Sequence, residues 1–180
     1  MYRYITFSGV VDVRMMEIWK SKVPLKVQIF LWMAWHDRIQ TAQQLRKRNW
    51  NGSKVSKYCG KEETVDRLLF QCPIAMVTWC WVRHNLGWSK SPTSIKTFQE
   101  NCLGTAGGSR NNTLWWIIAS VGWALQKTRN DLVFSNVIVK SPKQVVYKSL
   151  GFLKQWTKLS KDWSRMEGVL LKLKEGLSSW

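Results

Sequence analysis

Apolar residues recur three or four positions apart along most of the chain, which is the spacing of one face of an α-helix. The first such stripe follows Trp19 and consists of Val23, Val27, Phe30, Leu31 and Ala34. Pro24 suits the first turn of a helix, so the pattern predicts a helix that begins near this residue. A second face of this segment is also apolar and carries Leu25, Ile29 and Trp32. We therefore expect the helix to be covered on two sides.

Start and stop signals predict shorter helices in the next part of the chain. Thr41-Ala42-Gln43-Gln44 has the form of a capping box and predicts a short helix that runs to Arg48. Residues 64–71 are expected to make one or two helical turns with Leu68 and Leu69 packed inward. Pro73 then opens a helix that Gly87 is placed to end. The residues expected on the buried side of that helix are Ile74, Val77, Trp81 and Val82.

The second half of the chain predicts three longer helices after a short one at 92–102. Residues 114–133 begin with a stretch that is apolar all round, so we expect this helix to be central. Ser141-Pro142-Lys143-Gln144 combines a cap, a first-turn proline and a capping-box glutamine. Ser164-Arg165-Met166-Glu167 is another capping box and predicts the last helix.

These elements predict a mainly α protein of two small helical lobes. The segments are an N-terminal arm or short strand at 1–18, a first lobe at 19–87, a linker with a short helix at 88–112 and a second helical lobe at 113–180. The linker is placed there because Gly107-Gly108-Ser109 is flexible by composition. A chain of 180 residues is long enough for this arrangement.

Composition adds a strong positive charge and many indoles to this picture. The 28 Lys and Arg residues against 11 Asp and Glu give a formal net charge of +17, and there are 13 tryptophans. Such a charge attracts polyanions such as nucleic acid, but it also serves solubility alone, and the two interpretations carry equal weight. Some tryptophans are expected on a surface, because an indole is large and its N–H needs a partner.

The four cysteines are too sparse for a secreted disulfide framework, and we expect a reduced intracellular compartment, cytoplasm or nucleus. Arg3 and Arg14 with little acid near them are a faint sign of a mitochondrial presequence. The longest apolar run, 114–125, falls short of the ~20 residues that span a bilayer, so no membrane span is expected.

Residues 56–72 have the spacing of a small zinc knuckle that lacks two ligands. A Cys at position 56 and a His at 67 would complete a C-x2-C-x7-H-x4-C array, which suits a tetrahedral metal. The chain carries Ser56 and Arg67 there and keeps only Cys59 and Cys72. Two thiolates alone seldom hold a structural zinc, and Arg67 brings a positive charge toward the cation. We therefore expect no metal and no other cofactor.

Many spaced positions around this array resemble the zinc-binding domain that follows the reverse transcriptase in plant LINE-type retrotransposons. The positions are Trp19-x4-Pro24-x-Lys26-Val27-x-Ile29-Phe30-Leu31-Trp32, Ile39-x-Thr41, Leu45-x2-Arg48, Trp50-x-Gly52 and Cys72-Pro73-x-Ala75-x3-Trp79. A second cue, Trp123-x5-Arg129-Asn130-x3-Phe134, resembles the helical segment downstream in the same elements. The resemblance implies a retroelement-derived protein with a degenerate zinc site, kept or expressed alone in a plant genome.

The residue inventory does not favour an enzyme, and we expect no catalytic residues and no small-molecule substrate. His36 lies at the end of a Trp-rich helix, and His84 lies near a helix C-terminus where a cation is welcome. Glu62 and Glu63 are expected in a solvated turn. Cys59 is expected to be an ordinary thiol, since a reactive thiol needs an activating environment.

Two binding functions remain open. The first is contact with RNA or DNA through basic and aromatic residues of the first lobe: Lys20, Lys22, Lys26, Arg46, Lys47, Arg48, Lys54, Lys57 and Trp50. The second is contact with another protein or with itself, for which the candidates are Trp79, Trp88, Trp163 and Trp180. We expect protein contact or self-association in a domesticated, regulatory or toxin-like role, with sequence-tolerant nucleic-acid binding as the alternative.

Overall fold

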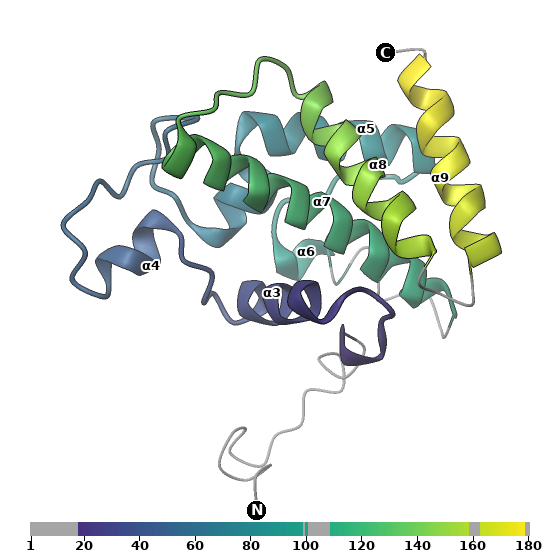
Figure 1. The fold of residues 1–180 in the computed structure, drawn as a ribbon, viewed down its shortest axis with the longest axis horizontal. Helices are drawn as coiled ribbons and strands as arrows, with labels where there is room; N and C mark the ends of the chain where they lie inside the picture. Colours follow the sequence, from purple (N-terminus) through teal and green to yellow (C-terminus); the bar gives the residue numbers. More distant parts are fainter. Residues whose placement is uncertain (1–17, 99, 101–108, 159–162, 179–180) are drawn as a thin grey trace, which may run out of the picture.

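The computed structural model describes residues 18–98, 100, 109–158 and 163–178 (Figure 1). This part of the chain is mainly helical and contains an isolated antiparallel bridge between Val55 and Glu62 but no strand, which confirms the predicted fold class. The predicted arm at 1–18 lies outside the described residues except for Ile18. None of the helices in the described ranges is long and apolar enough to cross a membrane.

The first two helices that the structure describes follow the predicted start signals. Helix α3 (Leu25–Trp35) begins directly after Pro24, which caps it. Helix α4 (Ala42–Arg46) begins after Thr41, whose hydroxyl accepts a hydrogen bond from the Gln44 N–H at 3.4 Å. This cap satisfies one of the N–H groups that a helix start leaves unpaired.

The knuckle stretch ends in a turn of π-helix, η1 (Arg67–Gln71), and continues into helix α5 (Pro73–Leu86). Cys72 is the N-cap residue of α5, and Gly87 ends the helix in the left-handed region with a φ of +66°. A residue other than glycine is strained in this backbone conformation. Val77 was predicted on the buried side of α5, but it is exposed because the helix packs on the core only along the side of Ala75, Trp79 and Val82.

Four further helices complete the described fold. The short helix α6 (Ile95–Phe98) is followed by the long helix α7 (Ser109–Ser135), then α8 (Lys143–Thr157) and α9 (Trp163–Ser178). Helix α7 starts at Ser109, so it takes in part of the segment predicted as linker. Propagating an existing helix costs less than starting one, and the apolar run after Thr113 supplies the burial that sustains it.

Helix α7 is the centre of the fold, as its all-round apolar sequence predicts. It contacts α8, α3 and η1, while α5 and α8 contact α9, and Figure 1 shows α7 crossing the middle of the molecule. The side chains of Trp115 and Trp116 on α7 are almost fully buried. The indole of Trp123 on α7 packs edge to face against the ring of Phe30 on α3. One contiguous core therefore contains residues from both predicted lobes. The division into two lobes stays a prediction.

Within the described part of the chain, α3 is covered on one side only, so the prediction of two covered sides is wrong. Val27, Phe30 and Leu31 are buried, whereas Leu25 and Ile29 are 64% and 43% exposed. The reason lies in the position of α3, which packs on α7 at the margin of the described fold (Figure 1).

Candidate functional site

The first half of the knuckle is a tight loop closed by backbone hydrogen bonds. The Ser56 N–H donates to the Lys61 carbonyl at 2.8 Å, and the Gly60 N–H donates to the Ser56 carbonyl at 2.9 Å. Gly60 has a φ of +66°, which glycine adopts without strain. The Ser56 hydroxyl accepts from the Tyr58 N–H at 3.2 Å. This loop holds Ser56 and Cys59 on one short piece of backbone.

The second half is the π-turn that carries Arg67 and leads to Cys72. The Arg67 N–H donates to the Thr64 hydroxyl at 3.1 Å, and the Cys72 N–H donates back to the Arg67 carbonyl at 2.8 Å. The backbone of Cys72 is therefore fixed relative to Arg67. π-turns are rare, and they often occur at functional positions of a protein.

The structure brings together the four positions that the sequence marks as a degenerate ligand set. Burial alone would raise the pKa of Cys59, but hydrogen bonds from the Lys61 N–H, the Ser56 hydroxyl and the Arg67 guanidinium, with the Arg67 charge, lower the pKa overall. For Cys72, burial first and the neighbouring Cys59 sulfur second raise the pKa of the thiol. Cys59 is among the groups that raise the pKa of Cys72, so the two thiols lie close enough to influence each other.

Polar contacts attach this loop to helix α7. The Tyr58 hydroxyl donates to the Thr128 carbonyl at 3.0 Å, and burial with the nearby Asp131 charge raises the pKa of Tyr58 to about 12. The Arg129 guanidinium binds the Glu63 carboxylate at 2.8 Å, and both side chains are about 95% buried. The prediction that Glu63 lies in a solvated turn is therefore wrong, whereas Glu62 is exposed as predicted.

This pairing of Glu63 with Arg129 is the contact that sequence reasoning missed. The carboxylate also accepts a hydrogen bond from the Ala42 N–H at 2.9 Å. In the sequence, Arg129 stood out only as part of the segment Trp123-x5-Arg129-Asn130-x3-Phe134, which resembles the same retroelements. This segment is far from the knuckle along the chain, so it gave no reason to pair Arg129 with Glu63. A buried charge needs a partner, and the fold supplies the partner from helix α7.

Residues 1–79 match the protein family described as zinc-binding in reverse transcriptase. This confirms the resemblance drawn from the sequence. The Arabidopsis thaliana protein named "Putative ribonuclease H protein" is 27% identical over 113 residues, which cover 59% of this chain and 18% of that relative. This chain thus spans less than a fifth of the length of the relative. No solved structure matches the chain.

The residues present do not fit the zinc ion that the reverse-transcriptase zinc-binding family implies. Structural zinc takes four ligands, and the cluster offers two thiols with a guanidinium beside them. Arginine is a permanent cation with no lone pair to donate, so Arg67 opposes a metal at this place. Within the described ranges, no group of three or more His, Cys, Asp or Glu side chains is placed to hold a metal ion. Cys80 and His84 are exposed on α5 and belong to no such group.

The basic candidates of the first lobe all lie on the surface. These exposed residues are Lys20, Lys22, Lys26, Arg46, Lys47, Arg48, Lys54, Lys57 and Trp50. The Lys47 ammonium is 3.9 Å from the Asp37 carboxylate. The Trp50 ring occupies the space that a side chain at position 52 would need, and Gly52 has none. The structure adds one feature that joins the two halves of the chain, since Lys26 and Lys127 approach the Trp123 ring at 6.0 and 5.6 Å.

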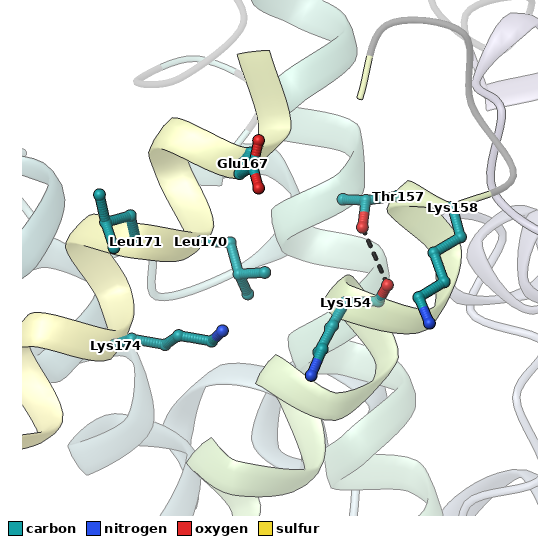
Figure 2. A pocket seen from close by; sticks show the side chains of 7 residues that line it. All are labelled: Lys154, Thr157, Lys158, Glu167, Leu170, Leu171 and Lys174. Atoms are coloured by element: carbon teal, nitrogen blue, oxygen red, sulfur yellow. Dashed lines mark hydrogen bonds between the residues drawn. The ribbon is translucent and has the colours of Figure 1, made fainter. Parts of the chain in front are cut away.

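A second basic region, which the sequence did not single out, lies between α8 and α9. A cavity of about 390 Å³ there is lined by Lys154, Thr157, Lys158, Glu167, Leu170, Leu171 and Lys174. Figure 2 shows Lys154 and Lys174 reaching toward each other from the two helices, with Leu170 nearby. The lysines are exposed side chains of a solvated face.

The tryptophans predicted for a protein interface divide between core and partial exposure. Trp79 is buried and its indole N–H donates to the Leu69 carbonyl at 2.7 Å, so it belongs to the core and offers no exposed surface. Trp88 is half-buried and stacks near Trp79. The side chain of Trp163 and all of Trp180 lie outside the described residues. Trp81, which was predicted on the buried side of α5, is buried, and so is Trp156.

Proposed function

We propose that this protein is non-catalytic and acts by binding another protein through the outer face of α3. This outer face is the stripe formed by Leu25, Ile29 and Trp32, which share one side of the helix because they are four and three positions apart. The exposure of Leu25 and Ile29 is the observation that carries the proposal. Burying each of these side chains would stabilise a complex by up to about 1.5–3 kcal/mol.

A single exposed leucine needs no explanation, but a stripe of three apolar side chains is the pattern of a helix that packs against a partner. Trp32 is half-buried, so the exposed part of its ring extends the apolar stripe. Aromatic residues of this kind contribute strongly to protein interfaces.

The charges that border the outer face indicate the chemistry of the partner. The Arg38 guanidinium lies 5.6 Å from the centre of the Trp32 ring, and the exposed Lys26 adjoins Leu25. A partner that fits has an apolar stripe with acidic residues at its rim. Self-association is the weaker alternative, because the formal net charge of +17 makes two copies repel each other at low salt.

The non-catalytic part of the proposal is supported by the surroundings of the two histidines. The His36 Nδ1 lies 2.8 Å from the Trp32 carbonyl, so this nitrogen has a structural partner, and His84 is exposed on α5. The match of residues 1–79 to the reverse-transcriptase zinc-binding family supports origin in a retroelement. A domesticated protein of this kind fits a regulatory or toxin-like role that depends on the partner it binds.

The test compares the variant Leu25→Ser/Ile29→Ser with a matched control, Leu171→Ser. Leu171 is 56% exposed on α9, so the control removes the same kind of surface at another place. Proteins that are crosslinked to the wild type in cells are identified by mass spectrometry and purified. Each is then titrated by calorimetry against the wild type and the two variants. We expect the double variant to bind the partner at least tenfold more weakly than the wild type, and the control to bind it with unchanged affinity. Equal binding by all three proteins would contradict the proposal.

Nucleic-acid binding is the second candidate, and the exposed basic run Arg46, Lys47 and Arg48 favours it. The test measures binding to single-stranded RNA by fluorescence anisotropy as salt is varied. If these three side chains contact phosphates, changing them to Gln reduces the slope of log affinity against log salt by about 2. The absence of RNA binding even at low salt would eliminate this candidate.

A further inference from the structure

We propose that the connection between α7 and α8 binds the surface of a lipid bilayer that contains anionic lipids. The contact consists of three exposed apolar side chains, Phe134, Val137 and Ile138, which we call the apolar loop, and of the lysines that follow them. Nothing in the family match assigns a membrane contact, and a contact with the bilayer surface needs no spanning helix. Figure 1 shows this connection along the edge of the molecule that lies opposite α3, so the apolar loop is separate from the outer face of α3.

The apolar loop is strongly exposed to solvent. Phe134 is 74% exposed, Ile138 is 70% exposed and Val137 is 55% exposed, and no described element covers them. Apolar side chains that are scattered singly over a surface are ordinary, but these three lie within five residues of the chain and form one patch. A patch of this kind indicates an interaction surface.

The end of helix α7 fixes the backbone of the apolar loop. Asn136 has a φ of +53°, a left-handed conformation in which asparagine is enriched, and the helix ends before it. The Val137 N–H donates to the Asp131 carbonyl at 3.0 Å, which ties the loop back to α7. The Arg129 guanidinium lies 6.0 Å from the centre of the Phe134 ring. Because the loop is already held in place, binding would cost little conformational entropy.

Positive charge surrounds the apolar loop along the chain. Residues 132–158 contain five lysines and no Asp or Glu. Asp131, the acidic residue that precedes them, is paired with Lys148 at 2.6 Å. Lys140 and Lys143 follow the apolar loop directly and are exposed. Lysines beside exposed apolar side chains are attracted to the negative headgroups of anionic lipids.

This combination fits a bilayer better than it fits a nucleic acid or a protein. Val137 and Ile138 are aliphatic and cannot stack on bases, so a nucleic acid would leave them uncovered. The headgroup region of a bilayer accepts apolar side chains and ammonium groups together. Tyr147 is 60% exposed on α8, four positions after Lys143 and therefore on the same side of the helix. Tyrosine is enriched at the interface between a membrane and water, so it extends the same surface.

The experiment measures binding of the full chain to vesicles by co-sedimentation. One set of vesicles contains phosphatidylcholine alone, and the other contains phosphatidylcholine and phosphatidylserine in equal parts. The loop variant Phe134→Ser/Ile138→Ser is compared with the wild type and with Leu25→Ser/Ile29→Ser, which removes two exposed apolar side chains elsewhere. All three proteins have the same net charge, so a difference between them reports the apolar contact. Circular dichroism checks that each variant keeps its helices.

We expect the wild type to bind the phosphatidylserine vesicles and to bind phosphatidylcholine alone much more weakly. The loop variant should bind the phosphatidylserine vesicles at least about tenfold more weakly than the wild type, and the α3 variant should bind them equally well. Lys140→Gln/Lys143→Gln should also weaken binding, and its binding should depend less on salt, because salt screens the attraction that these lysines provide.

Three results would overturn the proposal. The first is no binding to phosphatidylserine vesicles at low salt. The second is equal binding by the wild type and the loop variant, which would mean that net charge alone attracts the protein to the bilayer. The third is a loop variant that binds vesicles normally but loses a protein crosslinked to the wild type in cells, because the occupant of the apolar loop would then be that protein. None of these results depends on whether a protein binds the outer face of α3.

Discussion

Replacing Glu63 by Gln should strongly destabilise the fold, because it leaves the Arg129 guanidinium buried without a counter-charge. Glu63 Oε1 is 2.8 Å from Arg129 Nη2 and 3.2 Å from Nε, and both side chains are about 95% buried. Breaking a buried pair of this kind costs about 3–5 kcal/mol. At 2–4 °C per kcal/mol for a protein of this size, the Tm should fall by about 6–20 °C.

The structure offers a matched control in the ion pair between Lys148 and Asp131. These side chains are 2.6 Å apart, but they are 37% and 42% exposed. Asp131→Asn should therefore cost at most about 1 kcal/mol, because solvent screens the pair. Both variants are compared with the wild type by thermal unfolding, followed by circular dichroism, at one salt concentration.

A double variant separates the effect of charge from that of shape. Glu63→Leu/Arg129→Met removes both charges and should be more stable than Glu63→Gln, since apolar residues often replace a buried ion pair without loss. If Glu63→Gln lowers the Tm no more than Asp131→Asn does, the pair does not hold the knuckle on α7 and the reasoning fails.

Further predictions concern the thiols and two glycines. With rising pH, iodoacetamide should modify Cys59 before Cys72: despite the opposing effect of burial, hydrogen bonds and the Arg67 charge lower the pKa of Cys59, whereas burial raises that of Cys72. Mass spectrometry across a pH series would show this order, and a reversed order would contradict it. Gly87→Ala should cost about 1–2 kcal/mol in urea unfolding, because Gly87 has a φ of +66°. Gly151→Ala on the exposed side of α8 should instead stabilise the protein by about 0.5–1 kcal/mol, since no atom lies within 4 Å of the added carbon. If both substitutions changed the free energy of unfolding equally, the left-handed backbone of Gly87 would not be what makes it sensitive to substitution.

Several helix boundaries could be predicted from the sequence because their causes are local. The Thr41 cap, Pro73 at the start of α5 and Gly87 at its end act through hydrogen bonds and backbone preferences within a few residues. The central place of α7 was also predictable, since a helix that is apolar all round has to be buried. The start of α7 at Ser109 was not predictable, because glycines preceding it favour a loop locally.

The sequence also determined the resemblance to the reverse-transcriptase zinc-binding family and the loss of two ligand residues. Ser56 and Arg67 stand at fixed spacings from Cys59 and Cys72, and spacing is a property of the chain alone. The chemistry of the remaining thiols depended on the fold. Whether Cys59 meets Arg67 and Cys72 depends on how the loop and the π-turn pack, and the sequence led us to expect an ordinary thiol.

Two features were decided only by the tertiary structure. Glu63 finds its partner 66 positions away in Arg129, and the local sequence around Glu63 favours a solvated turn. Leu25 and Ile29 have the periodicity of a covered helix face, yet no described element covers them. Periodicity shows which residues share a face, because it follows from the geometry of one helix. Which face meets a neighbour depends on the packing of all the elements, and that is why the proposed interaction surface appeared only in the folded chain.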